Sequence, residues 1–386
     1  MKKITVCQVL NQYQVGGAET VALDLARSLD PGRFESLALA AVEPPAPEPA
    51  PMRRRFEAAG VPAHALVGRR LGDPRTLWAL LRFFRRHRPD IVHAHNRPAD
   101  HWALRCALWA GVPAVTWTRH LVYEDMTPRQ CRRYRALADR TPVVVAVSDE
   151  VRRHCLEVEG IPADRIRTVV NGIDTRRFRP AGADERRATR EALGLAPDEL
   201  ALLFVGRLTA QKAPEVFVDL VHRLRGDGLP VRGFLCGRGE RSAELQERCA
   251  RAEGAVLLGV RQDVPALLGA CDIFVSTSRN EGLPLNVMEA MAAGAAFVAP
   301  ELPQVRQLVA SEPELRAGLL PRPPAGEVPA ALVRRWSQAV ADLLADPAAR
   351  RRRGASARRV IEAGFSLERM VREHEAIYAE LLAATR

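Results

Sequence analysis

Two carboxylates in the second half of the chain have a spacing that suits a bound sugar. Glu281 and Glu289 flank a Gly-Leu-Pro turn in SRNEGLPLNVMEAMAAG, residues 278–294. Because glycine allows a sharp bend and proline favours the first helical position, we predict a helix from about Pro284 to Gly294. Glu281 then lies in the loop before the helix and Glu289 about one turn inside it. Carboxylates so placed can accept hydrogen bonds from vicinal hydroxyls.

A second segment supplies positive charge. Arg207 and Lys212 stand in GRLTAQKAPEVFVDL, which follows the strand-like run ALLFVG and precedes a helix that starts near Pro214. A strand end, two cations and a helix N-terminus make an anion site, because the helix dipole adds partial positive charge and arginine can bind two phosphate oxygens. Two cations suit a diphosphate better than a single phosphate. A pair of solvated surface cations is the alternative.

The first half of the chain holds weaker candidates. Gly16 and Gly17 open a helix after the strand-like run ITVCQVL, so a ligand can approach their amides, although an ordinary strand-to-helix turn has the same pattern. His93 and His95 end the run DIVHAH and face the same side at that spacing. Two histidines without a third ligand are poor evidence for zinc, so we predict no metal site there.

Length and composition favour an intracellular protein of two domains. The 386 residues exceed one ordinary core, and 47% hydrophobic residues can build two. No window of about eighteen uncharged apolar residues occurs, and the first residues do not form a secretory leader, so we expect a cytoplasmic location. The seven cysteines form no CxxC pair and most lie in apolar runs, which predicts reduced core residues.

The formal net charge of +11 admits anionic partners such as nucleic acid, an acidic membrane surface or phosphorylated substrates. Only 5% aromatic residues and no nucleic-acid module argue against nucleic acid. Residues 75–89, RTLWALLRFFRRHRP, place Trp78, Leu81 and Phe84 beside arginines. Such a helix can lie peripherally on the inner face of an anionic membrane. Alternatively, its apolar face packs on a sheet and its arginines face solvent.

Short runs rich in Val, Ile and Leu alternate with helical patterns, which predicts parallel sheets with crossover helices. The alternation stops between Asp174 and Leu200, where many charges and two prolines leave room for one short helix and no strand. We therefore predict an α/β protein with two doubly wound domains, at 1–176 and 190–365. The final helix, 366–386, has no strand after it and is expected to cross back to the first domain.

Six motifs occur in an order that resembles the retaining glycosyltransferases of family 4. They are GGAE, TRH, SDEVRR, VVNGID, GRLTAQK and EGLPLNVMEA, and they span nearly the whole chain. The resemblance implies the GT-B fold, in which two Rossmann-like domains face each other across a cleft. It implies transfer of a hexose from a nucleotide sugar, a UDP-sugar in particular, to a glycan or glycolipid acceptor, as in lipopolysaccharide or exopolysaccharide synthesis. Retention of anomeric configuration, with no metal or cofactor besides the donor, is also implied.

The resemblance assigns roles residue by residue. Arg207 and Lys212 match the pair that holds the donor diphosphate. Glu281 matches the glutamate at the transferred sugar, and His120, in TRH, matches a histidine that approaches the same sugar, which completes the catalytic set. Glu289 matches the glutamate that binds ribose. The other implied donor contacts, most of them through the backbone, are Gly17, Gly237, Val260, Arg261, Gly282, Leu283 and Leu285. The implied cleft-wall or acceptor contacts are Gly16, His93 and His95.

One departure from the family pattern affects the donor site. Members usually carry a GG-x-E loop after the helix, whereas this chain has PELPQVRQL with Gln304 near the glutamate position, so the donor sugar is harder to infer. The absence of a DxD motif from the sequence argues against the metal-dependent GT-A class. Two other functions stay open. A nucleotide-sugar epimerase of similar fold would convert the donor alone, and a nonenzymatic binder would hold the donor without transfer.

Overall fold

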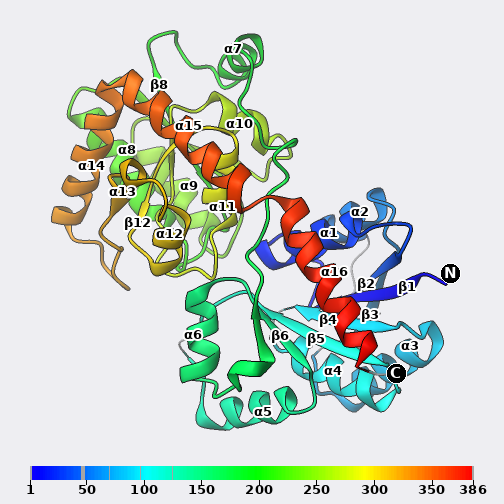
Figure 1. Cartoon of the computed structure of the whole chain (residues 1–386). Helices are drawn as coiled ribbons and strands as arrows, with labels where there is room; N and C mark the ends of the chain where they lie inside the picture. The colour runs from blue at the N-terminus through cyan, green and yellow to red at the C-terminus, as the bar shows by residue number, and fades with distance from the viewer. Residues whose placement is uncertain (1, 45–47, 69, 96, 124, 385–386) are drawn as a thin grey trace. The chain divides into compact units, whose positions relative to one another are not determined.

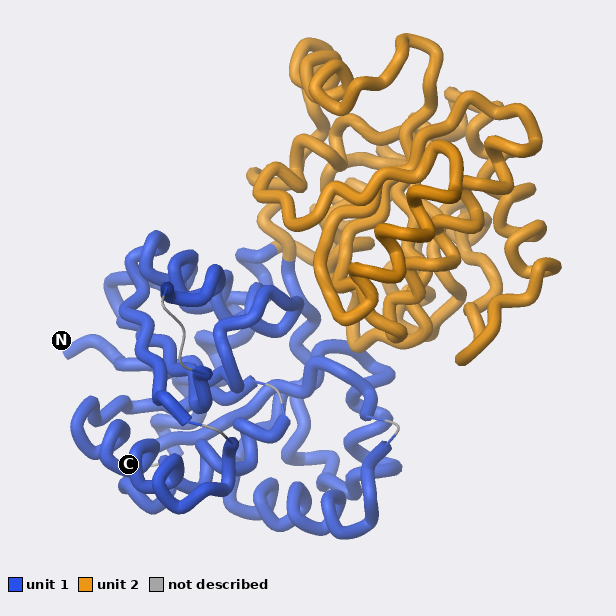
Figure 2. The backbone as a smooth tube through the Cα atoms, turned by 180° about the vertical axis from the view of Figure 1, so that it is seen from behind, with its two compact units in different colours: residues 1–172, 367–386 blue, residues 173–366 orange. Residues whose placement is uncertain are grey.

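The chain forms two compact units, each built around one parallel sheet. A computed structural model describes residues 2–44, 48–68, 70–95, 97–123 and 125–384 (Figure 1). Unit 1 comprises residues 1–172 and 367–386, and unit 2 comprises residues 173–366 (Figure 2). The units therefore meet in sequence at Gly172, just before the region where the strand pattern stops. Helix α7 (Ala183–Ala192), which the predicted boundaries divide, belongs to unit 2.

Unit 1 contains a seven-stranded parallel sheet in the order β3-β2-β1-β4-β5-β6-β7. Its strands are β1 (Ile4–Leu10), β2 (Phe34–Glu43), β3 (Ala63–Val67), β4 (Ile91–His95), β5 (Ala114–Arg119), β6 (Val143–Ala146) and β7 (Ile166–Thr168). The apolar runs predicted all of these except β3. That strand, AHALV, is an edge strand with a polar residue at its second position, so it lacks the continuous apolar run of a central strand.

Helices cover both faces of this sheet. They are α1 (Gly17–Ser28), α2 (Pro51–Ala58), α3 (Pro74–His87), α4 (Ala99–Trp109), α5 (Pro128–Ala138), α6 (Asp149–Glu157), the short η1 (Ala163–Arg165) and α16 (Leu367–Ala383). Right-handed crossovers place α1 and α2 on one face and α3 and α4 on the other. The last helix, α16, packs against α1 and β5, so the expected return of the chain to its first half is confirmed (Figure 1).

Unit 2 contains a six-stranded parallel sheet in the order β10-β9-β8-β11-β12-β13. Its strands are β8 (Leu200–Val205), β9 (Val231–Cys236), β10 (Ala255–Gly259), β11 (Ile273–Val275), β12 (Ala296–Pro300) and β13 (Leu319–Leu320). The remaining helices are α8 (Pro214–Gly226), α9 (Ser242–Arg251), α10 (Val264–Ala270), α11 (Leu285–Ala292), α12 (Pro303–Leu308), α13 (Pro313–Arg316), α14 (Ala330–Ala345) and α15 (Pro347–Gly364). The sequence did not predict β13, because two residues are too few to form a pattern.

The strand order reverses at one place in each sheet. In unit 1 the reversal lies between β1 and β4, and in unit 2 it lies between β8 and β11. In open α/β sheets, ligands bind outside the carboxyl ends of the strands at such a reversal, which we call the switch point. The doubly wound fold predicted from the sequence is confirmed, and it marks one candidate binding edge in each unit.

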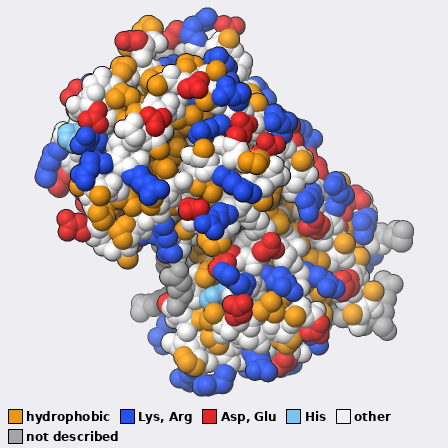
Figure 3. Space-filling model, turned by 60° about the vertical axis from the view of Figure 1, so that its left-hand side comes forward, with side chains coloured by type: hydrophobic (Ala, Val, Ile, Leu, Met, Phe, Trp, Pro, Cys, Tyr) orange, Lys and Arg blue, Asp and Glu red, His pale blue; other side chains and the backbone are white. Residues whose placement is uncertain are grey.

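The prediction of reduced core cysteines agrees with the structure, and the charges on the surface are mixed. All seven cysteines are free thiols, and six of them are buried. Acidic side chains alternate with the lysines and arginines on the face in Figure 3, so the positive charge there is dispersed. Among the described residues, no helix is both long and apolar enough to cross a membrane.

Candidate active site

The switch point of unit 2 brings together the two segments that the sequence singled out. Strand β8 leads into the loop of Arg207 and Lys212 and then into α8, and β11 leads into the loop of Glu281 and then into α11. The predicted helix is confirmed: α11 covers Leu285–Ala292, with Pro284 at its N-cap. Because β8 and β11 are neighbours in the sheet, their two loops lie side by side.

An ion pair joins these two loops. The Lys212 ammonium nitrogen Nζ contacts Oε1 of Glu281, and the two side chains are only 13% and 7% exposed. Arg207 donates from Nη2 to Oε1 of Gln211 at 3.1 Å, and the Gln211 amide donates to the carbonyl of Asn280 at 2.9 Å. Gln211 therefore links the exposed arginine to the residue before Glu281. The sequence contained Gln211 within its motif but assigned it no role.

The turn that carries Lys212 is unusual. Ala213, the N-cap of α8, has φ 47°, a left-handed conformation in which non-glycine residues are uncommon. The Thr277 hydroxyl, just beyond β11, shares its proton between the carbonyls of Lys212 and Ala213, both at 2.9 Å. Arg279 adds a second link by donating to the carbonyl of Pro324 at 2.6 Å and, at 2.8 Å, to a carboxylate oxygen of Glu215 on α8.

The loops after β8, β9 and β10 form a continuous backbone surface beside this ion pair. The amide of Gly206 donates to the carbonyl of Cys236 at 3.0 Å, and the amide of Gly237 donates to the carbonyl of Gly259 at 2.8 Å. A Cβ at Gly237 would lie 1.8 Å from the Gly206 carbonyl oxygen, so only glycine fits at this position. Gly237 is thus required by the close approach of two loops, besides its predicted contact with the donor.

Two further predicted donor residues gather at the same edge. Burial raises the pKa of the Cys236 thiol at the end of β9, and a hydrogen bond from the Arg261 backbone together with the Arg261 charge lowers it. Arg261 is already paired with Asp263, Nη2 to Oδ2 at 2.6 Å. Val260 is 56% exposed and is therefore accessible to a ligand.

The residues that follow Glu281 in the loop before α11 are largely buried. Gly282 and Leu283 are buried, and Leu285 is partly buried. Gln304, the residue that departs from the family pattern, donates from its amide to the Glu281 carbonyl at 2.9 Å. A glutamate cannot make that bond when ionised, because it only accepts. Gln304 therefore fixes the loop of Glu281, a role that the sequence did not reveal.

The switch point of unit 1 holds the other predicted residues. Gly16 is the N-cap of α1 and Gly17 its first residue, at the carboxyl end of β1. His95 is the last residue of β4, and His120 directly follows β5. The Nδ1 atom of His95 lies 2.9 Å from Nε2 of His120, so the structure brings these two histidines into one hydrogen bond.

The prediction that His93 and His95 line a cleft or contact an acceptor is corrected. Both side chains are fully buried, and their ring centroids lie 4.2 Å apart with the ring planes tilted by 32°. They do face one side of the strand, as their spacing predicts, but that side is covered by α16. His93 contacts the hydroxyl of Tyr378 on α16 through Nδ1 at 2.7 Å. The two histidines are interior residues that connect to His120.

Burial keeps these histidines neutral. The pKa values of His93 and His95 lie well below the ordinary value of 6.5, first because of burial and then because of nearby histidines. Burial lowers the pKa of His120 to about 3, with a smaller contribution from His374. The pKa of His374, on α16, is also lowered by burial. At neutral pH each ring therefore carries one proton, on one of its two nitrogens.

One compositional signal was available for Lys212. Of the 57 lysines and arginines in the chain, three are lysines, and the other two stand at Lys2 and Lys3. A lysine at this site in a chain that otherwise uses arginine indicates a need for a compact charge. No group of three or more His, Cys, Asp and Glu that could hold a metal ion occurs in the part of the chain that the structure describes.

Comparison with known proteins gives a family match for each half of the chain. Residues 15–177 match the family model for Glycosyltransferase Family 4, and residues 199–346 match that for Glycosyl transferases group 1. Two curated relatives span different shares of the chain. An Escherichia coli UDP-Gal:alpha-D-GlcNAc-diphosphoundecaprenol alpha-1,3-galactosyltransferase is 29% identical over 58% of this chain and 60% of its own length. An alpha-maltose-1-phosphate synthase of Mycolicibacterium smegmatis is 27% identical over 76% of this chain and 79% of its own.

The solved structures extend the likeness to the whole fold. Anabaena HepE, crystallised with UDP and glucose, superimposes with a TM-score of 0.82 at 18% identity, covering 98% of this chain and 100% of HepE. Such a likeness at low identity shows a shared fold, the GT-B fold of two Rossmann-like units. The matched stretches cover 60%, 56% and 48% of the first curated relatives, so their activities do not transfer directly.

Proposed function

The chain belongs to glycosyltransferase family 4, and from this premise we propose that it transfers a hexose from a nucleoside diphosphate sugar to a glycan or lipid-linked acceptor. The observation that carries the proposal is the Lys212–Glu281 ion pair beside Arg207 at the switch point of unit 2. A UDP-sugar is the proposed donor, because UDP occurs in the HepE complex and in the name of the galactosyltransferase.

The chemistry of transfer explains why these residue types are needed. Negative charge grows on the diphosphate as its bond to the sugar breaks, while the sugar gains positive character. A lysine has three N–H donors, so Lys212 can keep its bond to Glu281 and also contact a phosphate oxygen. One well-placed donor of this kind lowers the barrier by about 3 to 4 kcal/mol. Arg207 and the N-terminus of α8 add positive potential at the same edge.

The two glutamates are proposed to bind the sugar and the ribose. Glu281 has a second carboxylate oxygen that can accept a hydrogen bond from a hydroxyl of the transferred sugar, and Glu289, on α11, is proposed to accept hydrogen bonds from the ribose hydroxyls. We propose transfer with retention by a front-face route without a metal ion, in which a departing phosphate oxygen takes the acceptor proton. No side chain then has to act as a nucleophile.

A lipid-linked acceptor would require contact with a membrane, and unit 1 has a surface for it. Helix α3 buries Leu80, Phe83 and Phe84, which confirms the packing interpretation of its apolar face, but it leaves Trp78 61% exposed. The guanidinium of Arg82 lies over the Trp78 ring, 5.3 Å from its centroid. An exposed tryptophan beside arginines suits the boundary between lipid headgroups and acyl chains.

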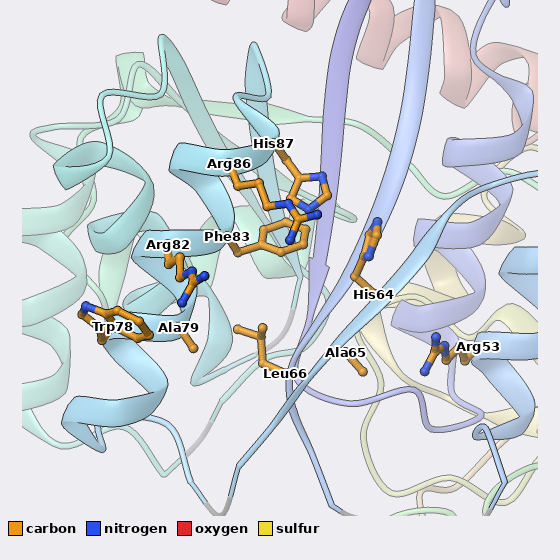
Figure 4. A pocket seen from close by; sticks show the side chains of 10 residues that line it. All are labelled: Arg53, His64, Ala65, Leu66, Trp78, Ala79, Arg82, Phe83, Arg86 and His87. Atoms are coloured by element: carbon orange, nitrogen blue, oxygen red, sulfur yellow. The ribbon is translucent and has the colours of Figure 1, made fainter.

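A groove of about 380 Å³ lies beside this helix (Figure 4). Its lining includes Arg53, Arg82 and Arg86 and no acidic side chain. The pKa values of His64 and His87 in the groove are lowered, first by burial and then by neighbouring charges that include arginines. We propose that this positive surface contacts anionic headgroups, which would bring a lipid-linked acceptor near the enzyme.

The donor proposal can be tested by measuring thermal stability in the presence of a set of nucleoside diphosphate sugars. A true donor at 100 times its dissociation constant adds about 2.7 kcal/mol to the free energy of unfolding. The selected donor is then incubated alone and with candidate acceptors. A new isomer of the donor without acceptor would indicate an epimerase, and stabilisation without any release of UDP would indicate a binder.

The metal and stereochemical proposals have their own measurements. Transfer should continue at an unchanged rate in the presence of EDTA, and loss of activity that Mg²⁺ restores would contradict a metal-free route. The anomeric configuration of the first product, measured by proton NMR before it can equilibrate, should equal that of the donor. An inverted product would exclude the front-face mechanism.

A further inference from the structure

A buried chain of hydrogen bonds connects the C-terminal helix to His120. Gln8, on β1, donates from its amide nitrogen to the hydroxyl of Tyr378 at 3.3 Å, and its Oε1 lies 2.8 Å from Nε2 of His95. His95 in turn contacts His120. Gln8, His95 and Tyr378 have no exposed surface at all. The register of the sheet supports this chain, because Gln8 pairs with His93 across β1 and β4.

The direction of donation along this chain determines where the proton of His120 lies. An amide oxygen only accepts, so Nε2 of His95 must carry its proton, and Nδ1 of the same neutral ring is bare. The Nε2 of His120, which faces that bare nitrogen, must then donate. We propose that Tyr378 and Gln8, acting through His95, hold His120 as the tautomer protonated on Nε2, and that Tyr378 is a positioning residue for the transfer reaction.

Tyr378 matters because the amide of Gln8 has two orientations. If this amide turned over, its nitrogen would donate to His95, and the proton of His120 would move to Nδ1. The Tyr378 hydroxyl opposes that reversal. It lies 2.7 Å from Nδ1 of His93. In the proposed arrangement it donates to that nitrogen, so its oxygen remains to accept from the Gln8 amide. Nε2 of His93 then donates to the Thr118 hydroxyl, 2.7 Å away.

This tautomer restricts what His120 can bind. Its Nδ1 carries a lone pair and can only accept a hydrogen bond, so a phosphate oxygen, which also only accepts, is excluded as its partner. A sugar hydroxyl can donate to it. This part of the inference rests on the proposed function. In that function His120 contacts a hydroxyl of the sugar or acceptor, and Arg207 and Lys212 bind the diphosphate.

The tautomer can be measured without any substrate. In the whole chain with ¹⁵N-labelled histidine, long-range proton–nitrogen spectra separate protonated from bare ring nitrogens, and the signals of His120 are those that vanish in His120→Asn. The proposal expects a protonated Nε2 and a bare Nδ1 in the unmodified protein. A protonated Nδ1 would overturn it, whether or not the protein proves to be a glycosyltransferase, and a transferase assay that fails leaves these spectra valid.

Variants test the link to α16. Tyr378→Phe removes one hydroxyl and should give His120 a mixture of both tautomers. With UDP-glucose as the probe, release of UDP should show kcat lower by about tenfold, while KM changes by less than about twofold. Tyr13→Phe is the matched control. It removes another buried hydroxyl of unit 1, one that donates to the His64 carbonyl at 3.0 Å, and should leave the His120 spectrum unchanged. If Tyr378→Phe folds and keeps the original tautomer, the positioning role is wrong.

Discussion

The two switch points have opposite electrostatic characters. In unit 2 the edge of the sheet holds the Lys212–Glu281 ion pair, 13% and 7% exposed, beside the exposed Arg207. In unit 1 the corresponding edge holds neutral histidines, of which His93 and His95 are fully buried and His120 is 8% exposed. A charged ligand has to exchange water for fixed charges, which requires an exposed cation such as Arg207, whereas a ring that has to be oriented is best held by a buried network. The edge of unit 2 therefore suits the binding of a charged group, whereas the edge of unit 1 suits the positioning of a side chain.

The largest expected effect is on the acid stability of unit 1. The folded-state pKa values of His93, His95, His120 and His374 lie below 6.5, so the unfolded chain binds more protons than the folded one between pH 6.5 and about 3. Stability is therefore complete above pH 6.5 and falls as the pH is lowered. At pH 5.5 each of His93, His95 and His120, whose folded-state pKa values lie furthest below 6.5, costs about 1.4 kcal/mol. Calorimetry from pH 7.5 to 5.5 should show this loss.

Unit 2 provides the internal control for the acid experiment. His222 is its only histidine in the sequence, and this side chain is exposed. Limited proteolysis at pH 5.5 should accordingly cleave unit 1 before unit 2. His374→Gln should reduce the acid loss and His222→Gln should not. If both units were cleaved equally fast at pH 5.5, the proposed difference between the two switch points would be wrong.

The next effect concerns the charges of unit 2. Lys212→Ala and Glu281→Ala should each reduce kcat by about 10² to 10³, because each removes a group placed for charge that develops during the reaction. Steady-state rates of UDP release and of product formation measure this. Arg223→Ala is the control. It removes a cation on α8 whose partner is Asp227, 2.8 Å away, and should leave turnover unchanged. Near-normal turnover in either site variant would refute the assignment.

A smaller effect is expected from the support beneath Lys212. Thr277→Val keeps the shape of the side chain but removes the hydroxyl that donates to the carbonyls of Lys212 and Ala213, and leaves the Ala213 carbonyl with only the Val216 amide as donor in the described part of the chain. This loss should cost about 1 to 2 kcal/mol of unfolding free energy. Thr209→Val is matched to it, since the Thr209 hydroxyl is buried with no partner among the described residues. Its removal should be neutral or stabilising. Urea unfolding of both variants decides whether the left-handed turn needs Thr277.

The smallest effect concerns the surface of unit 1 that is proposed to contact a membrane. Arg82→Ala and Arg86→Ala should each weaken binding to vesicles that contain anionic lipid by about 1 kcal/mol, and binding should fall as salt is added. Cosedimentation with vesicles measures this, with neutral vesicles as the comparison. Arg334→Ala, a cation of α14 in unit 2, should have no effect. Equal binding to neutral and anionic vesicles would contradict the headgroup proposal.

How far the sequence could predict this site depended on where its residues stand in the chain. Arg207, Lys212 and Glu281 stand in short motifs at strand ends, where a parallel sheet brings neighbouring loops together, so their meeting could be foreseen. Gln8 and Tyr378 are 370 positions apart, and no local pattern relates them. For the same reason the sequence predicted His93 and His95 as cleft-wall or acceptor contacts: their spacing gives the side they face, but only the position of α16 shows that this side is covered.

The return of α16 to unit 1 has a consequence for biosynthesis. Unit 1 begins to emerge from the ribosome before unit 2, yet the helix that supplies Tyr378 is made after every residue of unit 2. Domains tend to fold as they are synthesised, so unit 2 can reach its fold while unit 1 still exposes the sheet surface that α16 will cover. A chain that stops early would therefore present intact charges for the nucleotide but an unsupported His120. Synthesis of the chain through α16 thus becomes a condition for activity.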